Sequence, residues 1–181
     1  IIAVICIIMG CVGVSSTSYI VVVIFAAPAL MRMGIGLAQA HFYVMYVCNF
    51  AFITPPIAIA VLIASQLAKS KYIGSCVETI KISMGALILS LALIYVPAIL
   101  LQPEEPLSTV IGMSSVILSL FAFPVAFLGY FVRDCSAVER VVWFLCGVVL
   151  IVSMVQQSAL LFAIGIAVFV LLTLLQFLIG K

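Results

Sequence analysis

Residues 82–101 read ISMGALILSLALIYVPAILL and contain no charged side chain. Apolar side chains fall on every face of a helix drawn through this stretch, so no face of it suits water. About 20 helical residues cross the ~30 Å hydrocarbon core of a bilayer. The stretch therefore predicts a membrane-spanning α-helix.

The rest of the chain has the same character. It is 68% hydrophobic and 7% charged, with a mean hydropathy of +1.55, which is far from the composition of a water-soluble domain. Long stretches without a charged side chain, His41 apart, also lie between Arg32 and Lys69, Glu105 and Arg133, and Arg140 and Lys181. A membrane β-barrel would instead alternate apolar and polar residues over strands of about ten. We predict an all-α, polytopic integral membrane protein.

Charge and cysteine content exclude several functions. A net charge of +2 over 181 residues gives no basic patch, so no nucleic-acid partner is expected. The six cysteines form no C-x-x-C pair and there is one histidine, so we expect small packing residues rather than a zinc site or a disulfide framework. Apart from Glu139 and Arg140 at the start of the run 137–179, no predicted span contains Asp, Glu, Lys or Arg, so we predict that the chain is not an enzyme.

Two of the apolar segments are interrupted. In residues 1–31 the polar stretch Gly10 to Ser18 separates two apolar runs, and in residues 40–68 the break is Ile53-Thr54-Pro55-Pro56. Two adjacent prolines remove two amide donors and disfavour helical geometry in the residue before them. We expect a re-entrant or broken segment at 1–31 and a broken helix at 40–68; hydropathy leaves open whether 1–31 is a hairpin or one broken span.

The later segments predict uninterrupted spans at about 82–101, 107–132 and 137–179, after a charged loop at 69–81. The last run has 43 residues, about 65 Å of helix and twice the hydrocarbon thickness. We divide it at Gln156-Gln157-Ser158 into spans at 137–155 and 159–179. Residues 1–101 would then form one region and residues 102–181 a set of additional transmembrane helices.

Basic residues predict the orientation of the loops. Lys69, Lys71 and Lys81 lie in one loop, Arg133 and Arg140 two loops later, and Lys181 at the end. We place these on the inside, and the intervening loops at 102–106, with Glu104 and Glu105, and at 156–158 on the outside. Asp134 and Glu139 are expected to be solvated.

Interrupted membrane helices predict a binding site, because unpaired backbone groups in lipid cost several kcal/mol unless they line a cavity or face protein. Half-helix N-termini suit a carboxylate, while freed carbonyls and hydroxyls can coordinate Na⁺. The candidate site residues are Gly10, Gly13, Ser15, Ser16, Thr17, Asn49, Thr54, Pro55 and Pro56. Of these, Ser15, Ser16 and Thr54 are the candidate Na⁺ ligands, and no other cofactor is expected.

Other readings of these residues remain open. The glycines can serve close helix packing and the prolines a structural kink, which would suit a non-transporting membrane scaffold or assembly subunit. Asn49 needs either an interhelical hydrogen bond or a place in the ion site. A membrane-embedded enzyme would need acidic or nucleophilic residues from outside this chain.

Three motifs resemble a known family. The stretch Gly10-Cys11-Val12-Gly13-Val14-Ser15-Ser16-Thr17-Ser18-Tyr19, followed by Ala26-Ala27-Pro28-Ala29-Leu30, is similar to Gly-Met-Gly-Met-Pro-Thr-Thr-Ala-Ala-Tyr and Ala-Ala-Pro-Ala-Leu in the large permease subunit of TRAP transporters. Ala40-His41-Phe42 leading to Ile53-Thr54-Pro55-Pro56-Ile57-Ala58 is the second match. Tyr95-Val96-Pro97-Ala98-Ile99-Leu100 resembles the family's Tyr-Asn-Pro-Ala-Leu-Leu. Val12, Gly13 and Val14 depart from the family pattern.

The resemblance implies Na⁺-coupled uptake of organic acids delivered by a periplasmic substrate-binding protein, across the bacterial inner membrane. It implies an elevator-like transport domain built from inverted repeats, of which this chain, opening on Ile1 rather than Met, would hold the later one as a C-terminal fragment. The helices after residue 107 would correspond to small-subunit-like helices of a fused permease.

Overall fold

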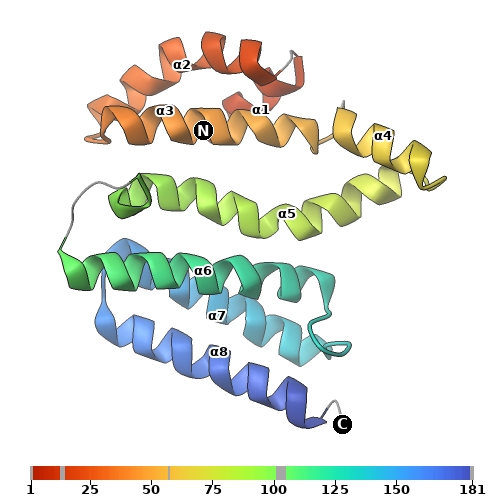
Figure 1. The fold of residues 1–181 in the computed structure, drawn as a ribbon, viewed down its shortest axis with the longest axis vertical. Coiled ribbons are helices and arrows are strands. Elements are labelled where there is room, and N and C mark those ends of the chain that lie inside the picture. The colour runs from red at the N-terminus through yellow and green to blue at the C-terminus, as the bar shows by residue number, and fades with distance from the viewer. Residues whose placement is uncertain (1, 13–14, 57, 101–104, 180–181) are drawn as a thin grey trace. The chain divides into compact units, whose positions relative to one another are not determined.

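The computed structural model of the chain describes residues 2–12, 15–56, 58–100 and 105–179. These residues form eight α-helices and two short 3₁₀ helices (Figure 1). Four of the helices are long and apolar enough to cross a membrane: Tyr72–Tyr95, Pro106–Leu128, Ala137–Gln156 and Ala159–Leu178. The predicted all-α, polytopic class is confirmed.

The chain divides into two compact units, Ile1–Ile80 and Lys81–Lys181. The first contains α1 (Ile2–Val12), α2 (Ser15–Arg32), α3 (Leu37–Asn49), η1 (Phe50–Phe52), α4 (Ile59–Leu67) and the start of α5 (Tyr72–Tyr95). The second contains the rest of α5, η2 (Pro97–Leu100), α6 (Pro106–Leu128), α7 (Ala137–Gln156) and α8 (Ala159–Ile179).

α1 and α2 form a helical hairpin. Ile2 and Ile5 of α1 line one groove with Val21, Phe25 and Ala29 of α2, whereas a chain running straight through both helices would separate Ile2 from Ala29 by about 40 Å. At roughly 17 Å, α1 is also too short to cross the bilayer core. Of the two arrangements that hydropathy left open, the hairpin is the one adopted.

The break between α1 and α2 is narrower than the polar stretch from Gly10 to Ser18. Residues 10–12 complete α1, and Ser15 to Ser18 form the first turn of α2. The two helices therefore extend into the polar stretch from both sides, because serine and threonine are tolerated in a helix and favoured at its start. Gly13 lies outside the described residues, as do Glu104 and Lys181 of the predicted loops.

The charged segment 69–81 is mostly helix rather than the expected loop, since α5 begins at Tyr72. Lysine and glutamate are good helix formers, and one face of this first part is buried, with Cys76 packed beside Ala58 and Val61. At its other end α5 stops at Tyr95 rather than continuing to residue 101, because Pro97 cannot donate a helical hydrogen bond.

The second unit is held together by close helix contacts at glycines. A Cβ on Gly147 of α7 would lie 2.7 Å from Cδ2 of Phe123 in α6, and a Cβ on Gly85 of α5 would lie 2.7 Å from the Leu120 carbonyl oxygen. The Ser115 and Ser153 hydroxyls are hydrogen-bonded across α6 and α7 at 2.9 Å. Small residues that let helices approach, joined by hydroxyl bonds, are typical of packing in membranes.

α6 ends at Leu128, four residues before the predicted Val132, because Gly129 takes a left-handed conformation at φ 75°. Residues 129–136 then form a compact loop in which the Cys135 N–H donates to the Gly129 carbonyl at 2.7 Å. The next boundary, between α7 and α8, falls at Gln157 and Ser158, within the polar cluster at which the sequence analysis divided the run.

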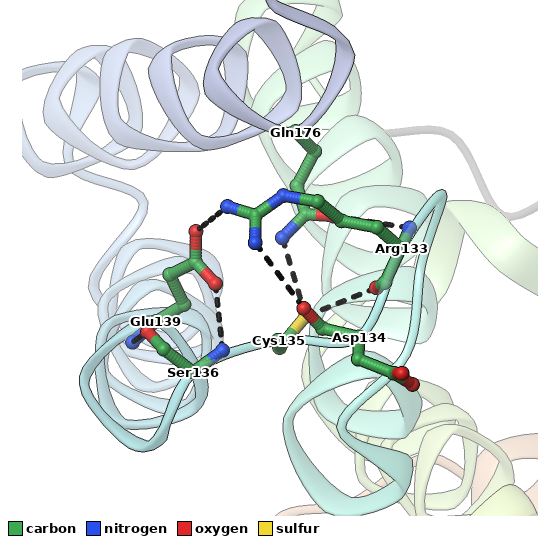
Figure 2. Close-up of polar contacts among 6 residues, drawn as sticks. All are labelled: Arg133, Asp134, Cys135, Ser136, Glu139 and Gln176. Atoms are coloured by element: carbon green, nitrogen blue, oxygen red, sulfur yellow. Dashed lines mark hydrogen bonds and ion pairs between the residues drawn. The ribbon is translucent and has the colours of Figure 1, made fainter. Parts of the chain in front are cut away.

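Polar contacts join this loop to α7 and α8 (Figure 2). The Arg133 guanidinium pairs with Glu139 at 2.5 Å, and Glu139 and Ser136 form the capping box that begins α7. Gln176 of α8, which is 1% exposed, accepts from the Arg133 N–H and donates to the Cys135 sulfur, both at 3.4 Å. Glu139 is therefore part of a closed network and not a solvated charge.

The environment of the Cys135 thiol disfavours its ionised form. Partial burial, followed by the negative charge of Glu139, raises the pKa of Cys135, and the nearby Arg133 and Arg140 offset only part of this rise. A raised thiol pKa leaves less nucleophilic thiolate at any pH below it.

Gly147→Ala should lower the free energy of unfolding by about 1–3 kcal/mol, because the added methyl group overlaps the Phe123 ring. Thermal unfolding of the full protein in detergent measures the change. Gly74→Ala in α5, where a Cβ meets nothing within 4 Å, is the matched control and should not destabilise. Phe123→Leu added to Gly147→Ala should recover part of the loss, and no recovery would contradict the proposed overlap.

Near neutral pH, alkylation of Cys135 should be slower than that of a free cysteine. Its rate should rise with pH and show an inflection above the ordinary thiol pKa. Glu139→Gln removes the negative charge while keeping a side chain that can serve the capping box, so it should move the inflection to lower pH. Mass spectrometry of the peptide containing Cys135 measures both rates. An inflection at or below the ordinary value would show that burial does not control this thiol.

Candidate functional site

The break after α3 arises from the two prolines. Pro55 and Pro56 have no N–H, so the carbonyls of Ala51 and Phe52 lose the donors that a continuous α-helix would supply. The helix first tightens into η1, where the Ile53 N–H donates to the Phe50 carbonyl at 3.1 Å. The interruption therefore leaves the carbonyl oxygens of Ala51 and Phe52 outside the hydrogen-bond pattern of a continuous α-helix.

Thr54 and Asn49 both bond to the backbone one turn earlier. The Thr54 hydroxyl donates to the Phe50 carbonyl, and the Asn49 amide donates to the Met45 carbonyl at 2.9 Å. Thr54 is half-buried, whereas Asn49, Pro55 and Pro56 are exposed. A hydroxyl and a side-chain amide each carry an oxygen as well as a donor, so both side chains are of a type that can coordinate a cation.

The chain re-enters helix at α4. Ala58 precedes it in a left-handed conformation, with φ 35°, and is completely buried against Val61 and Cys76. The first amides of α4 point back toward the break, and they give this end of the helix a partial positive charge. The Tyr72 hydroxyl of α5 donates to the Pro56 carbonyl at 3.1 Å, so Tyr72 holds the interruption in place.

The hairpin lies beside this break. α1 packs against α3 and η1, and the buried side chains of Cys6 in α1 and Cys48 in α3 lie close to each other. Because the chain reverses after α1 and again after α2, α1 runs parallel to α3. The last turn of α1, which holds Gly10, therefore lies at the level of η1, and the structure brings these two interrupted segments together.

The other predicted site residues lie in α2 and not at the proline break. Ser15 and Ser16 form the start of α2, and Thr17, the next residue, is exposed. In the first unit the described helices contain no Asp or Glu before Glu78, so the oxygens that these helices place around the break are neutral.

One pair of residues was missed by the sequence analysis. The Tyr19 hydroxyl and His41 Nδ1 lie 2.9 Å apart, which joins α2 to α3, and their rings meet edge to face at 6.4 Å. Both residues stand in the stretches that carry the family resemblance, but nothing in their spacing predicts that they touch. His41 thus joins α3 to the hairpin of α1 and α2.

Comparison with known families matches the region just described. A family model described as "Tripartite ATP-independent periplasmic transporter, DctM component" matches residues 1–99, which include the hairpin, the proline break and α5. No curated protein and no solved structure matches the chain.

Tyr72→Phe should lower the free energy of unfolding by about 0.5–1.5 kcal/mol, because the ring remains while the bond to the Pro56 carbonyl is lost. Thermal unfolding of the full protein gives the value. Tyr46→Phe is the matched control, since the contact of its ring with Phe50, at 6.0 Å between centroids, survives loss of the hydroxyl. Equal effects of the two substitutions would mean that the Tyr72 hydroxyl does not stabilise the break.

Proposed function

Because the chain belongs to the family of the DctM component of tripartite ATP-independent periplasmic transporters, we propose that it forms part of a permease that couples Na⁺ entry to uptake of an organic acid. The chain is a multi-pass membrane protein and a permease component. The observation that carries the finer proposal is that the family match covers both interrupted segments, which pack against each other in the first unit.

The proposed Na⁺ site uses neutral oxygens. Its ligands are the carbonyls of Ala51 and Phe52, deprived of helical donors by Pro55 and Pro56, together with the Thr54 hydroxyl. Ser15 and Ser16, at the start of α2, are further candidates. Freed carbonyls and hydroxyls at interrupted helices are suited to Na⁺. With no carboxylate before Glu78, the bound cation has its charge balanced best by an anionic substrate.

The proposed substrate site is the start of α4. Its first amides and its partial positive charge suit a carboxylate, and the left-handed Ala58 sets their direction. A carboxylate there would lie near the Na⁺ ligands of η1, so each ion would strengthen binding of the other. This mutual charge balance supplies a physical basis for coupling.

We place the permease in the bacterial inner membrane, where it would receive its organic acid from a periplasmic substrate-binding protein. In this proposal residues 1–101 belong to the transport region, as the later of two inverted repeats. Residues 102–181 supply additional transmembrane helices like those of a small subunit. Transport then requires the complete permease that contains this chain.

The test is uptake by the complete permease in proteoliposomes, with its binding protein and a panel of labelled mono- and dicarboxylates. An inward Na⁺ gradient should drive accumulation, and a K⁺ gradient of equal size should not. Flux of no substrate under either gradient would favour a scaffold or assembly subunit. Flux driven by a proton gradient alone would support the transport function but contradict the proposal that Na⁺ is the coupling ion.

Thr54→Ala in the complete permease should raise the Na⁺ concentration for half-maximal uptake roughly five- to tenfold, as expected for loss of one ligand worth about 1 kcal/mol. Thr79→Ala is the matched control, because the Thr79 hydroxyl also donates to a carbonyl four residues earlier, that of Ser75 at 2.8 Å, but Thr79 belongs to α5 and not to the interrupted segment. Unchanged Na⁺ titrations for Thr54→Ala would remove Thr54 from the site.

A further inference from the structure

A groove between α6 and α7 has no part in the proposed transport site. It has a volume of about 360 Å³ and is lined by Ala126, Phe127, Ala137, Arg140, Val141 and Phe144. Five of these side chains are apolar, and Arg140 is the single charged one. The groove lies where α6 ends and α7 begins, beside the polar loop 129–136.

Arg140 is fixed at this groove by the end of α6. Its Nε donates to the Ala126 carbonyl and its Nη2 to the Phe127 carbonyl, both at 3.0 Å. The guanidinium lies over Gly129, where a Cβ would come within 3.1 Å of Nε. These bonds use two of the five N–H donors of an arginine, so the same group that closes α6 can still bind an anion.

The positive charge of Arg140 is not cancelled by its acidic neighbour. Glu139 is paired with Arg133 at 2.5 Å, and within the described residues Arg140 forms no ion pair. Carbonyl oxygens at the end of α6 carry only partial negative charge. The mouth of the groove is therefore electropositive, and Ala137, the first residue of α7, lines it.

The walls of the groove are apolar and rigid. Phe144 meets Phe127 edge to face at 6.0 Å and Phe123 at 5.5 Å. Because α6 and α7 are both long enough to span the membrane and the charged loop joins them, the mouth lies at headgroup level and the walls extend into the hydrocarbon. A cation above an apolar groove is complementary to one molecule of the bilayer in particular, a phospholipid.

We propose that this groove binds one anionic phospholipid, with its phosphate on the Arg140 guanidinium and an acyl chain along Phe127, Val141 and Phe144. A free phosphate ion would gain nothing from the apolar walls, and a neutral acyl chain would gain nothing from Arg140. The orientation expected from the basic loops places the groove in the cytoplasmic leaflet, where anionic lipids give a negative surface potential.

The experiment is native mass spectrometry of the full protein, released from nanodiscs that contain equal amounts of phosphatidylglycerol and phosphatidylcholine. The wild type should retain one phosphatidylglycerol per chain. Val141→Trp should reduce retention at least fivefold, since the indole fills the groove without touching the bonds that close α6. Arg140→Gln should reduce it by about fivefold, the factor for one basic residue near an anionic surface.

Val138→Trp is the control, because Val138, two residues before Arg140 in α7, is 73% exposed but does not line the groove. It should retain the lipid as the wild type does. Equal retention by Val141→Trp and wild type would overturn the proposal, as would equal binding of both lipids. A groove closed by another part of the protein would retain no lipid in the wild type, which would overturn it as well.

Discussion

The fold depends on one constraint, which is that lipid offers no hydrogen-bond partner to the backbone. Each peptide N–H and C=O within the bilayer must be satisfied by the protein itself. The four long helices meet this requirement through their helical hydrogen bonds, except that Pro124 in α6 supplies no N–H to the Leu120 carbonyl. In the first unit the requirement is met differently, since Tyr72 bonds the Pro56 carbonyl and α1 packs along η1.

The same constraint explains the hydrogen bonds that charged residues form at the loop between α6 and α7. Arg140 closes the carbonyl end of α6 through Ala126 and Phe127, and Glu139 with Ser136 closes the amide end of α7. Arg133 then neutralises Glu139 and is joined to Gln176 of α8. Of the charged residues at this loop, Arg140 and Glu139 therefore bond to backbone groups at helix ends.

At the candidate site the constraint becomes useful for transport. Oxygens that have lost their helical donors are costly in lipid, but a bound cation satisfies them. In the function proposed above, the stretch before Glu78 supplies no carboxylate, and an anionic substrate would balance the charge of the cation. Interrupted helices with neutral ligands therefore suit the proposed permease, which would bind Na⁺ and an organic acid together and release them together.

The sequence by itself determined the membrane class, the long spans, the proline break and the family, because each depends on local composition or on a short motif. The apolar stretch at residues 82–101 predicts membrane helix wherever it is placed. In the same way, Pro55 and Pro56 interrupt a helix in any tertiary setting. Helix ends were less certain: the prediction missed the early stop at Gly129 and the start of α5 at Tyr72, where packing and a left-handed glycine outweigh hydropathy.

Only the tertiary structure decided that residues 2–32 form a hairpin, that α1 lies beside η1, and that Tyr19 meets His41. The same is true of the network of Arg133, Glu139 and Gln176. The physical reason is that hydropathy has the same profile for a hairpin and for a broken span. Contacts between residues far apart in the chain depend instead on how helices pack, and no local pattern encodes them.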